Sequence, residues 1–374
     1  MRNLEKSRQK LDSAPKLNAK MRLALFAGIS TLIIAICILV YIFGPPAYVY
    51  ENSDWGAWSY TPDYNTTKWN ILLDAHSHEK TNGGLLTYGG DGGYLTPEQN
   101  ILWHISLGYN AMILTDHNTY ENVEETIRIA EEKYASKIVV LPGCEWTTTT
   151  IHCNLVFPPD APIESYSYIV PPKGEITNET IRKMINQTHA AGGIVIVNHI
   201  PWTLRVLGVN ASREALLSGG ADYIEIVNQN EWDNDSYKFC LENGMGMVFG
   251  SDMHWPVEVY GYTLMNASSF TAQAVFDELK NKRTEVLYIP HGTPYEVEHK
   301  LSLAFVALRP LMQIGAMFAY YIDGIANIDW MGLGVFLAYL YVAFGILELF
   351  REKTIQRICR ECGKRLSKGK RMKR

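Results

Sequence analysis

The sequence predicts an α/β fold built on parallel strands, either a barrel or an open sheet, from three observations. Between about residue 68 and residue 290, short apolar runs alternate with stretches of helical periodicity. Seven such runs occur, most of them bounded by turn-forming residues. Residues of the metal-ligand types stand at the carboxyl end of nearly every run. This alternation is typical of a sheet whose functional groups gather at one end of its strands.

The predicted strands are rich in apolar residues and too short to be helices of ordinary length. In chain order they are NILLDAH (70–76), NAMILTDH (110–117), KIVVLPG (137–143), HCNLVF (152–157), GGIVIVNH (192–199), DYIEIVN (222–228) and GMVFGSD (246–252).

Helices are predicted between the strands. Thr96-Pro97-Glu98 begins one, because it supplies an N-cap residue, a proline for the first turn and an acid. Residues 122–135 form a second, whose apolar stripe consists of Val123, Ile127, Ala130 and Tyr134. Further helices are predicted at 178–191, 212–218, 235–243 and 270–281.

The charge of the 374-residue chain is unevenly distributed. Seven basic and two acidic residues lie in 1–22, and eleven basic and two acidic residues lie in 351–374. The region between them holds 16 basic and 35 acidic residues. An acidic central region repels a polyanion, so a nucleic-acid polymer is an improbable partner.

The basic ends flank apolar segments that predict an integral membrane protein. Residues 23–43 are 21 uncharged residues, the length needed to cross a bilayer. We interpret them as an uncleaved anchor rather than a signal peptide, because the run is long and no small-x-small cleavage site follows. Residues 330–347 form a second predicted span. Residues 301–322, interrupted by Arg309 and Pro310, form a kinked span, an interfacial helix or a re-entrant segment.

The positive-inside bias places residues 1–22 in the cytoplasm and the acidic region outside the cytoplasm. The basic tail also favours the cytoplasm, which requires an even number of spans, whereas counting 301–322 gives three. We prefer two spans and leave this conflict open. Asn-x-Ser/Thr sequons, which favour an external domain weakly, occur at Asn65, Asn178, Asn186, Asn210, Asn234 and Asn266.

The strand ends carry a set of residues that predicts a metal site. A single buried histidine is more often a hydrogen-bonded core residue, and an aspartate at a strand end is often a cap. Six of the ten histidines lie at strand ends, however, together with Glu145 and Asp252. Imidazole and carboxylate are the ligands of zinc, manganese or iron, and burying so many titratable groups without a cation is costly.

The ordered motifs DAHSH, DGGYLTPEQ, ILTDHN, GCEW, IVNHIP and GSDMHW resemble the PHP domain, the polymerase and histidinol phosphatase superfamily, over residues 70–290. The resemblance implies a distorted (β/α)₇ barrel with two or three divalent ions (Mn, Zn or Fe) at the strands' carboxyl ends. The ligands that it implies, position by position, are His76, His78, Asp91, His117, Glu145, His152, His199, Asp252 and His254.

One segment departs from the family's pattern. The aspartate of the second motif usually follows the HxH pair closely, whereas KTNGGLLTYGG separates it from Asp91 here. The glycines of this insertion predict a flexible loop, which we interpret as a possible substrate lid. Asp74 either orients a ligating histidine or caps the loop, and the sequence leaves both interpretations open.

The resemblance implies hydrolysis of a phosphate mono- or diester by a hydroxide activated on the metal centre, because most characterised members are phosphoesterases. The substrate is expected to be a small or lipid-linked phosphate ester. Arg205 is the candidate phosphate anchor. The alternative interpretation is that Arg205 is an ordinary surface residue. Two alternatives remain: a metallohydrolase of another bond, and a non-catalytic scaffold or receptor.

These expectations divide the chain into six segments. They are a basic N-terminus (1–22), a first span (23–43), a linker (44–67), a metallohydrolase domain (68–295), a membrane-associated helical region (301–350) and a basic tail (351–374).

Overall fold

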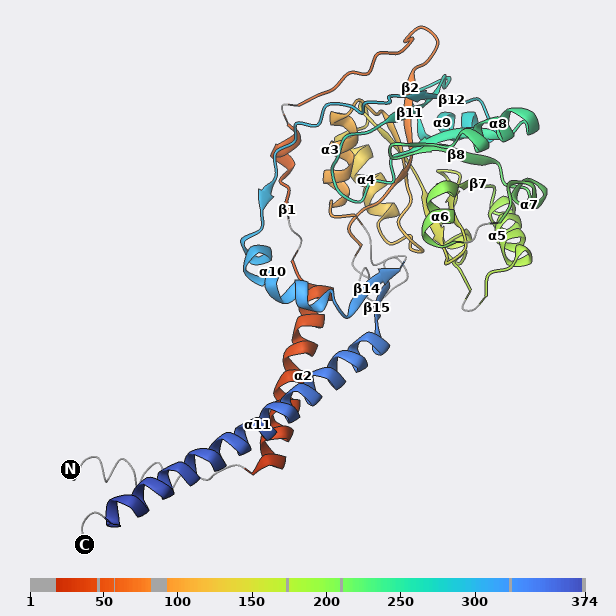
Figure 1. Cartoon of the computed structure of the whole chain (residues 1–374). Coiled ribbons are helices and arrows are strands. Elements are labelled where there is room, and N and C mark those ends of the chain that lie inside the picture. The colour runs from red at the N-terminus through yellow and green to blue at the C-terminus, as the bar shows by residue number, and fades with distance from the viewer. Residues whose placement is uncertain are drawn as a thin grey trace. The chain divides into compact units, whose positions relative to one another are not determined.

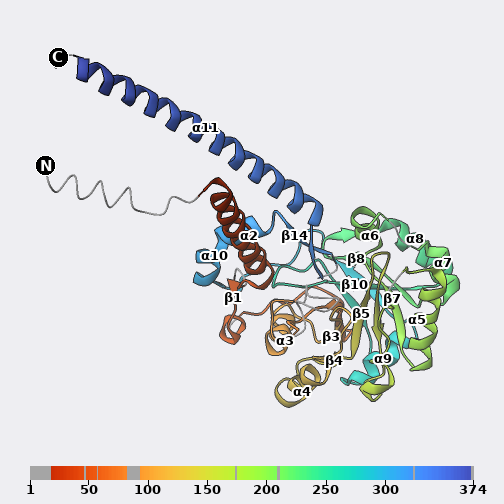
Figure 2. The ribbon, with the colours of Figure 1, turned by 90° about the horizontal axis from the view of Figure 1, so that it is seen from below.

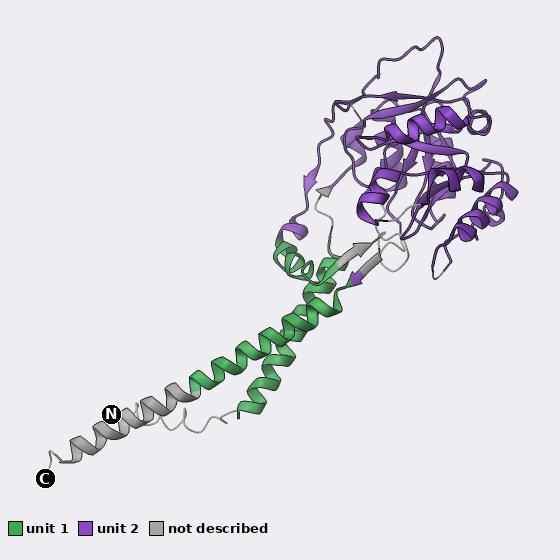
Figure 3. Ribbon diagram, turned by 45° about the vertical axis from the view of Figure 1, so that its right-hand side comes forward, with its two compact units in different colours: residues 1–44, 307–320, 328–374 green, residues 45–306, 321–327 purple. Residues whose placement is uncertain are grey.

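The computed structural model describes residues 18–45, 48–56, 58–81, 93–172, 175–208, 211–322 and 325–371. The chain divides into two compact units, coloured separately in Figure 3. The smaller unit consists of residues 1–44, 307–320 and 328–374. The larger unit consists of residues 45–306 and 321–327.

The smaller unit contains two helices that are long and apolar enough to cross a membrane. They are α2 (Ala19–Phe43) and the first part of α11 (Trp330–Arg371), up to Arg351. Their apolar side chains are largely exposed, as expected for helices surrounded by lipid. Length and composition therefore agree with the two predicted spans, while the side of the membrane is not determined by them. A shorter apolar helix, α10 (Leu303–Gly315), contains Pro310 and lies within the uncertain segment 301–322.

The larger unit is built on two mixed sheets (Figure 1). The first has the strand order β12 (Glu285–Tyr288), β11 (Gly261–Met265), β2 (Ile71–Ser77), β3 (Ala111–Leu114) and β4 (Val139–Leu141). The second has the order β10 (Gly246–Gly250), β8 (Tyr223–Asn228), β7 (Ile194–Val197), β6 (His152–Val156) and β5 (Gly143–Thr147), with β9 (Glu231–Trp232) paired to β8.

All seven predicted strands are present, but the sheets are mixed, which corrects the predicted parallel arrangement. Strands β5, β6 and β7 pair antiparallel, and so do β2, β11 and β12. Only four residues connect β5 to β6, which is too short for a parallel crossover and suits a hairpin. Strands β5, β11 and β12 were not predicted from the sequence.

The described strands do not pair into one closed ring, so the predicted barrel is not confirmed. Two isolated parallel bridges nevertheless join the sheets at the strands' ends. One pairs Ser77 with Met253, and the other pairs His117 with Glu145. Both bridges lie beside predicted metal ligands, so the ligand-bearing ends of the two sheets are held together.

Helices lie outside the strands of this unit, as Figure 2 shows for α3 and α4 on one side and α5, α7 and α8 on another. Thr96 caps α3 through a reciprocal capping box with Gln99, and Pro97 takes the first position, which confirms the predicted helix start. Helix α6 was not predicted. The helices are α3 (Pro97–Ser106), α4 (Val123–Lys133), α5 (Asn178–Ala190), α6 (Ile200–Val206), α7 (Arg213–Gly219), α8 (Asn234–Asn243) and α9 (Ala272–Lys280).

Strand β2 is buried on both faces, which explains its nearly continuous apolar run. Ile71, Leu73 and Ala75 pack in one hydrophobic cluster, while Leu72 packs in the other. Because side chains alternate between faces, His76 points to the same face as Leu72. The core therefore sets the direction in which the first motif presents its histidines.

Candidate metal centre

The structure brings together the side chains of eight predicted ligands. Each contacts at least one other member through a ring nitrogen or a carboxylate oxygen within 4 Å. They are His76, His78, His117, Glu145, His152, His199, Asp252 and His254. The ninth, Asp91, lies outside the described residues.

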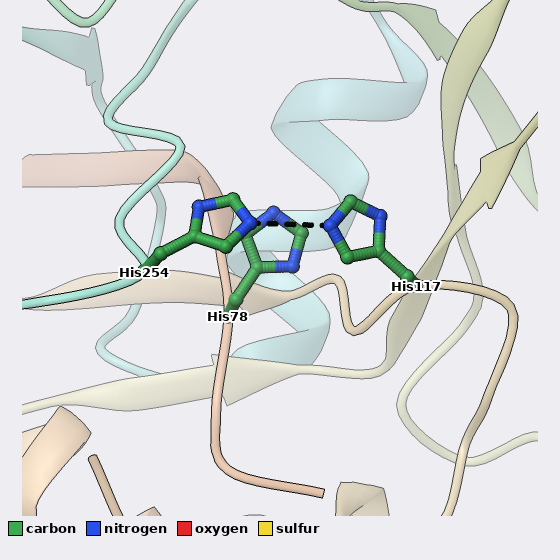
Figure 4. Close-up of side chains that lie close together, drawn as sticks. All are labelled: His78, His117 and His254. Carbon is green, nitrogen blue, oxygen red and sulfur yellow. Dashed lines mark hydrogen bonds between the residues drawn. The ribbon is translucent and has the colours of Figure 1, made fainter. Parts of the chain in front are cut away.

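Three groups of ligand atoms converge closely enough to hold an ion, with all atoms of a group within 4.8 Å of one another. In the first, His78, His117 and His254 approach one another as Figure 4 shows, and the Nε2 atoms of His117 and His254 are 3.2 Å apart. The second group is His76, Glu145 and His199, and the third is His76, His78 and Asp252. His76 and His78 each belong to two groups, so the groups form one continuous centre.

Glu145 lies at the middle of this centre. Its carboxylate is fully buried, and the ring nitrogens of His76, His152 and His199 lie 3.2–3.4 Å from its Oε1. The other oxygen, Oε2, contacts Nδ1 of His117. Glu145 therefore has imidazoles at both of its carboxylate oxygens, and carboxylate and imidazole are both ligands of divalent metals.

His152 reaches the centre from the beginning of a strand rather than from its end. It opens β6, and β6 pairs antiparallel with β5, so that His152 stands opposite Thr147 at the end of β5. The start of β6 and the end of β5 therefore share one edge of the sheet.

In several of these histidines, the ring nitrogen that faces away from the centre (the outer nitrogen) donates a hydrogen bond to an acceptor. The other ring nitrogen (the inner nitrogen) then presents its lone pair to the centre. His76 Nδ1 donates to Glu225 Oε1 (2.8 Å), and His254 Nδ1 donates to the main-chain oxygen of Asp252 (3.0 Å). His152 Nε2 donates to the main-chain oxygen of Thr148 (3.1 Å). A carboxylate or carbonyl can only accept, so each inner nitrogen of the neutral ring is unprotonated, as metal binding requires.

The donor set of these residues fits metal ions. One of the three groups consists of imidazoles alone, and the other two combine imidazoles with a carboxylate. Imidazole and carboxylate are the ligands of zinc, manganese or iron. The identity and number of the ions do not follow from this donor set.

The electrostatics keep three of these ligands, Glu145, Asp252 and His78, in the protonation states that metal binding needs. Burial raises the pKa of Glu145 and Asp252, but the surrounding histidines, His117 and His76 foremost, outweigh burial, so both pKa values lie well below the ordinary range. Burial and the neighbouring His254 and His117 hold the pKa of His78 well below its usual value. Both carboxylates are therefore ionised and His78 is neutral at pH 7.

His76 shows the excess of negative charge around the centre. Burial lowers its pKa, but the carboxylates of Glu225, Asp252 and Glu145 raise it more, so the pKa lies well above its ordinary value. A proton on His76 thus occupies a position where the surrounding field favours a cation. A divalent ion would compete for that position.

Backbone strain is concentrated at this centre. Among the described residues, five that are not glycine have positive φ. Two of them, His199 (φ 22°) and Asp252 (φ 52°), are predicted ligands. Asn118 follows His117 directly, and Gln229 donates to Asp252 at 3.3 Å. Such conformations cost about 1–3 kcal/mol each and persist where function requires them.

Asp74 holds the two ligand-bearing loops together. Its Oδ1 accepts hydrogen bonds from the main-chain nitrogens of His76 (3.1 Å) and Ser251 (2.9 Å), and its Oδ2 lies 3.1 Å from His104 Nε2. Of the two interpretations left open by the sequence, the structure therefore favours a loop cap.

Sequence reasoning missed Glu225, the acid that orients His76. Its second oxygen accepts hydrogen bonds from the main-chain nitrogen of His199 (3.0 Å) and from Asn228 Nδ2 (3.1 Å). The signal was present in the sequence, because Glu225 is a charged residue inside the apolar strand YIEIVN. A buried acid inside a strand requires a partner and so indicates a site.

Arg205 lies on the solvent-exposed side of α6. Its guanidinium forms a two-point salt bridge with the carboxylate of Glu231 (2.8 and 3.0 Å), and the arginine side chain is 59% exposed. The predicted phosphate anchor is thus already paired with a carboxylate in this structure.

Comparison with known proteins gives no match to a family model and no match to a curated protein. Solved structures do match. A two-domain protein from Bacteroides vulgatus, which contains a predicted PHP-like metal-dependent phosphoesterase, is 19% identical with a TM-score of 0.46, and the match covers 62% of this chain and 68% of that one.

Two further structures are similar over part of this chain. A protein from Bifidobacterium adolescentis, named as a candidate metal-dependent phosphoesterase, is 18% identical (TM-score 0.36, covering 49% of this chain and 88% of that one). An amidohydrolase from Chromobacterium violaceum, with bound sulfate and no metal, is 16% identical (TM-score 0.36, covering 58% and 97%). PHP-like proteins are thus among the structural neighbours.

Proposed function

We propose that this protein is a membrane-anchored, metal-dependent phosphoesterase. The observation that supports the proposal is the sharing of His76 and His78 between ligand groups, because overlapping groups of ligands are what adjacent ions would require. Adjacent divalent ions, when bound, activate water and neutralise the developing charge on a transferring phosphoryl group. The order of the motifs, which resembles that of PHP domains, favours a phosphate ester over other bonds.

The chain's own residues would hold and orient this centre. Glu145, fully buried and contacted from both oxygens, would hold metal together with the surrounding histidines. Asp252, with 14% of its side chain exposed, would supply a second carboxylate ligand. Glu225 would keep His76 directed inward.

Arg205 would serve as a phosphate anchor only if it exchanged the Glu231 carboxylate for the substrate's phosphate. Guanidinium binds both anions through the same two-point geometry, so the exchange is chemically matched. The two apolar helices would keep the protein at a membrane, where soluble and lipid-linked esters are both accessible. We place the domain outside the cytoplasm, on the charge asymmetry of the sequence.

The test uses the full-length protein, purified in detergent and supplied with manganese or zinc. It is assayed with an aryl phosphate, a phosphate diester, and a panel of carboxylic esters and amides. We expect phosphate-ester hydrolysis that is abolished by a chelator. Hydrolysis confined to the carboxylic ester or amide panel would show a metallohydrolase of another bond.

Metal content tests the centre independently of activity. We expect His76→Ala and Asp252→Ala each to lose bound metal, measured by mass spectrometry on folded protein. His291→Ala, an exposed histidine outside the centre, is the matched control and should keep the wild-type metal content. Unchanged stoichiometry in His76→Ala and Asp252→Ala would refute the assignment.

A further inference from the structure

A hollow of about 200 Å³ adjoins the candidate metal centre. Asp252 and His254, two of the predicted ligands, line one side of it. Trp255, Glu258 and Tyr260 line other parts. Because two predicted ligands line the hollow, it is within reach of an ester whose phosphate is held at the centre.

Away from the predicted ligands Asp252 and His254, the only charged side chain among the residues that line the hollow is the carboxylate of Glu258, so that part of the hollow is negative. No lysine or arginine is among its lining residues, all of which belong to the described part of the chain. Glu258 is half-buried, and Tyr260 donates a hydrogen bond to its Oε1 at 3.0 Å, which fixes the carboxylate's position. Among the described side chains, none that is basic forms a salt bridge with Glu258. An anionic alcohol would be repelled here.

Aromatic residues share the lining of the hollow with this carboxylate. The Trp255 side chain is 53% exposed, its ring lies 6.2 Å from that of His254, and Tyr94 packs edge-on against it at 6.4 Å. Exposed aromatic rings attract cations through their negative faces, most strongly in the case of tryptophan. Aromatic rings beside an unpaired carboxylate are the chemistry that recognises an ammonium group.

The free-energy balance of substrate binding favours the same ligand. A substrate that fills the hollow removes water from Glu258, which is unfavourable unless a positive charge replaces that water. A neutral alcohol would leave the carboxylate unpaired, whereas an amine would pair with it.

We propose that the hollow binds the ammonium group of an amino-alcohol phosphate ester, so that the substrate is zwitterionic. This inference rests on the proposed function. In the reaction, the bond between phosphorus and the alcohol oxygen breaks. Water supplies a hydroxyl to phosphorus and a proton to the alcohol oxygen, and the amino alcohol leaves with its ammonium unchanged. The ester is a soluble metabolite or a lipid headgroup, since both carry this chemistry.

The experiment compares phosphoethanolamine and phosphocholine with glycerol 1-phosphate, whose alcohol is neutral, using the full-length protein in detergent with manganese. We expect kcat/KM to be about tenfold higher for the ammonium esters. Glu258→Gln and Trp255→Ala should each remove most of that preference. Glu296→Gln, an exposed carboxylate that does not line the hollow, should retain it.

A second arm presents the ester as a lipid, in vesicles of phosphatidylethanolamine or of phosphatidylglycerol. If the preference for the ammonium group appears with the vesicles alone, the substrate is a lipid. A preference among soluble esters alone identifies a metabolite. Equal rates for ammonium and neutral esters in both arms overturn the inference and leave the phosphoesterase function standing.

Binding of choline, measured by calorimetry, separates the two proposals if no phosphate ester is hydrolysed. Choline binding that Glu258→Gln abolishes would support the ammonium site while the phosphoesterase function fails. No choline binding to the wild-type protein, in the absence of hydrolysis, would overturn both.

Discussion

At the scale of single residues, the candidate centre depends on groups that hold the ligands as well as on the ligands. Glu225 joins two of them, because one carboxylate oxygen binds the ring of His76 and the other binds the main chain of His199. A carboxylate behind a ligating histidine fixes its tautomer and raises its basicity.

Replacing Glu225 with glutamine tests this role. Glutamine has nearly the same shape but only one acceptor oxygen and no charge, so it cannot serve both histidines equally. We expect metal affinity to fall about 10–100-fold, measured by competition with a chelator. Glu285→Gln, at an exposed acid paired with Lys68, should leave the affinity unchanged. A wild-type affinity in Glu225→Gln would contradict the role.

At the scale of elements, the end of β10 is shaped by a close approach. A Cβ at Gly250 would lie 1.8 Å from Glu225 Oε1 and 2.7 Å from the Cβ of His76. Only glycine leaves room for the contact between that acid and that histidine.

Gly250→Ala should therefore displace Glu225 or His76. We expect the free energy of unfolding to fall by about 1–3 kcal/mol, together with a loss of bound metal. Chemical denaturation and metal analysis measure the two effects. The control is Gly56→Ala, where the nearest atom to a new Cβ is 3.5 Å away. Equal effects of the two substitutions would show that Gly250 has no special role.

Helices α3 and α4 are joined by an ion pair whose pH dependence can be predicted. Glu98 accepts hydrogen bonds from Lys133 (3.0 Å) and Tyr134 (2.9 Å). The hydrogen bond from Lys133 lowers the pKa of Glu98, although partial burial opposes it. Because the folded-state pKa is lowered, this contribution to stability is present above the unfolded-state pKa and is lost as the pH falls through the folded-state pKa.

Glu98→Gln should lower the free energy of unfolding by about 0.5 kcal/mol at neutral pH. The difference from wild type should disappear at pH values below the folded-state pKa, where the wild-type carboxyl is protonated as well. Denaturant titrations at the two pH values measure it. Glu132→Gln, in an exposed pair with Arg128, should have a smaller effect at both. A difference that persists in acid would mean that the charge of Glu98 is not its cause.

At the scale of the whole molecule, an acidic region stands between two basic ends and two apolar helices. Exposed apolar side chains on α2 and α11 would aggregate in water, whereas lipid accommodates them.

We expect the full-length protein to remain in the membrane fraction after washing with alkaline carbonate. For the side of the domain, a cysteine at the exposed position of Asn178 should react with an impermeant maleimide in intact cells, in a background where Cys359 and Cys362 are serine. A cysteine replacing Ser13, in the basic N-terminus, should react only after lysis. The reverse pattern would place the domain in the cytoplasm.

Local chemistry made much of this protein predictable from the sequence. Thr96 and Pro97 predicted the start of α3 because the cap and the restricted φ act within one turn. The apolar runs that end in His76, His117 and His199 also predicted strands locally, because the length and hydrophobicity of a run are properties of its own residues. The sequence by itself thus predicted seven strands, most of the helices and nine ligand candidates, of which eight lie within the described residues.

Only the tertiary structure decided how these elements meet. The antiparallel pairing of β11 with β2 joins strands that are far apart in the chain, so the sequence of β11 does not reveal its direction. Glu225 became a site residue because β8 lies where its carboxylate meets His76, 149 residues away in the chain. The negative, aromatic hollow beside His254 likewise exists only in the folded chain, because it lies between residues from separate segments. Backbone propensity acts over a few residues, whereas a site depends on contacts that only packing creates.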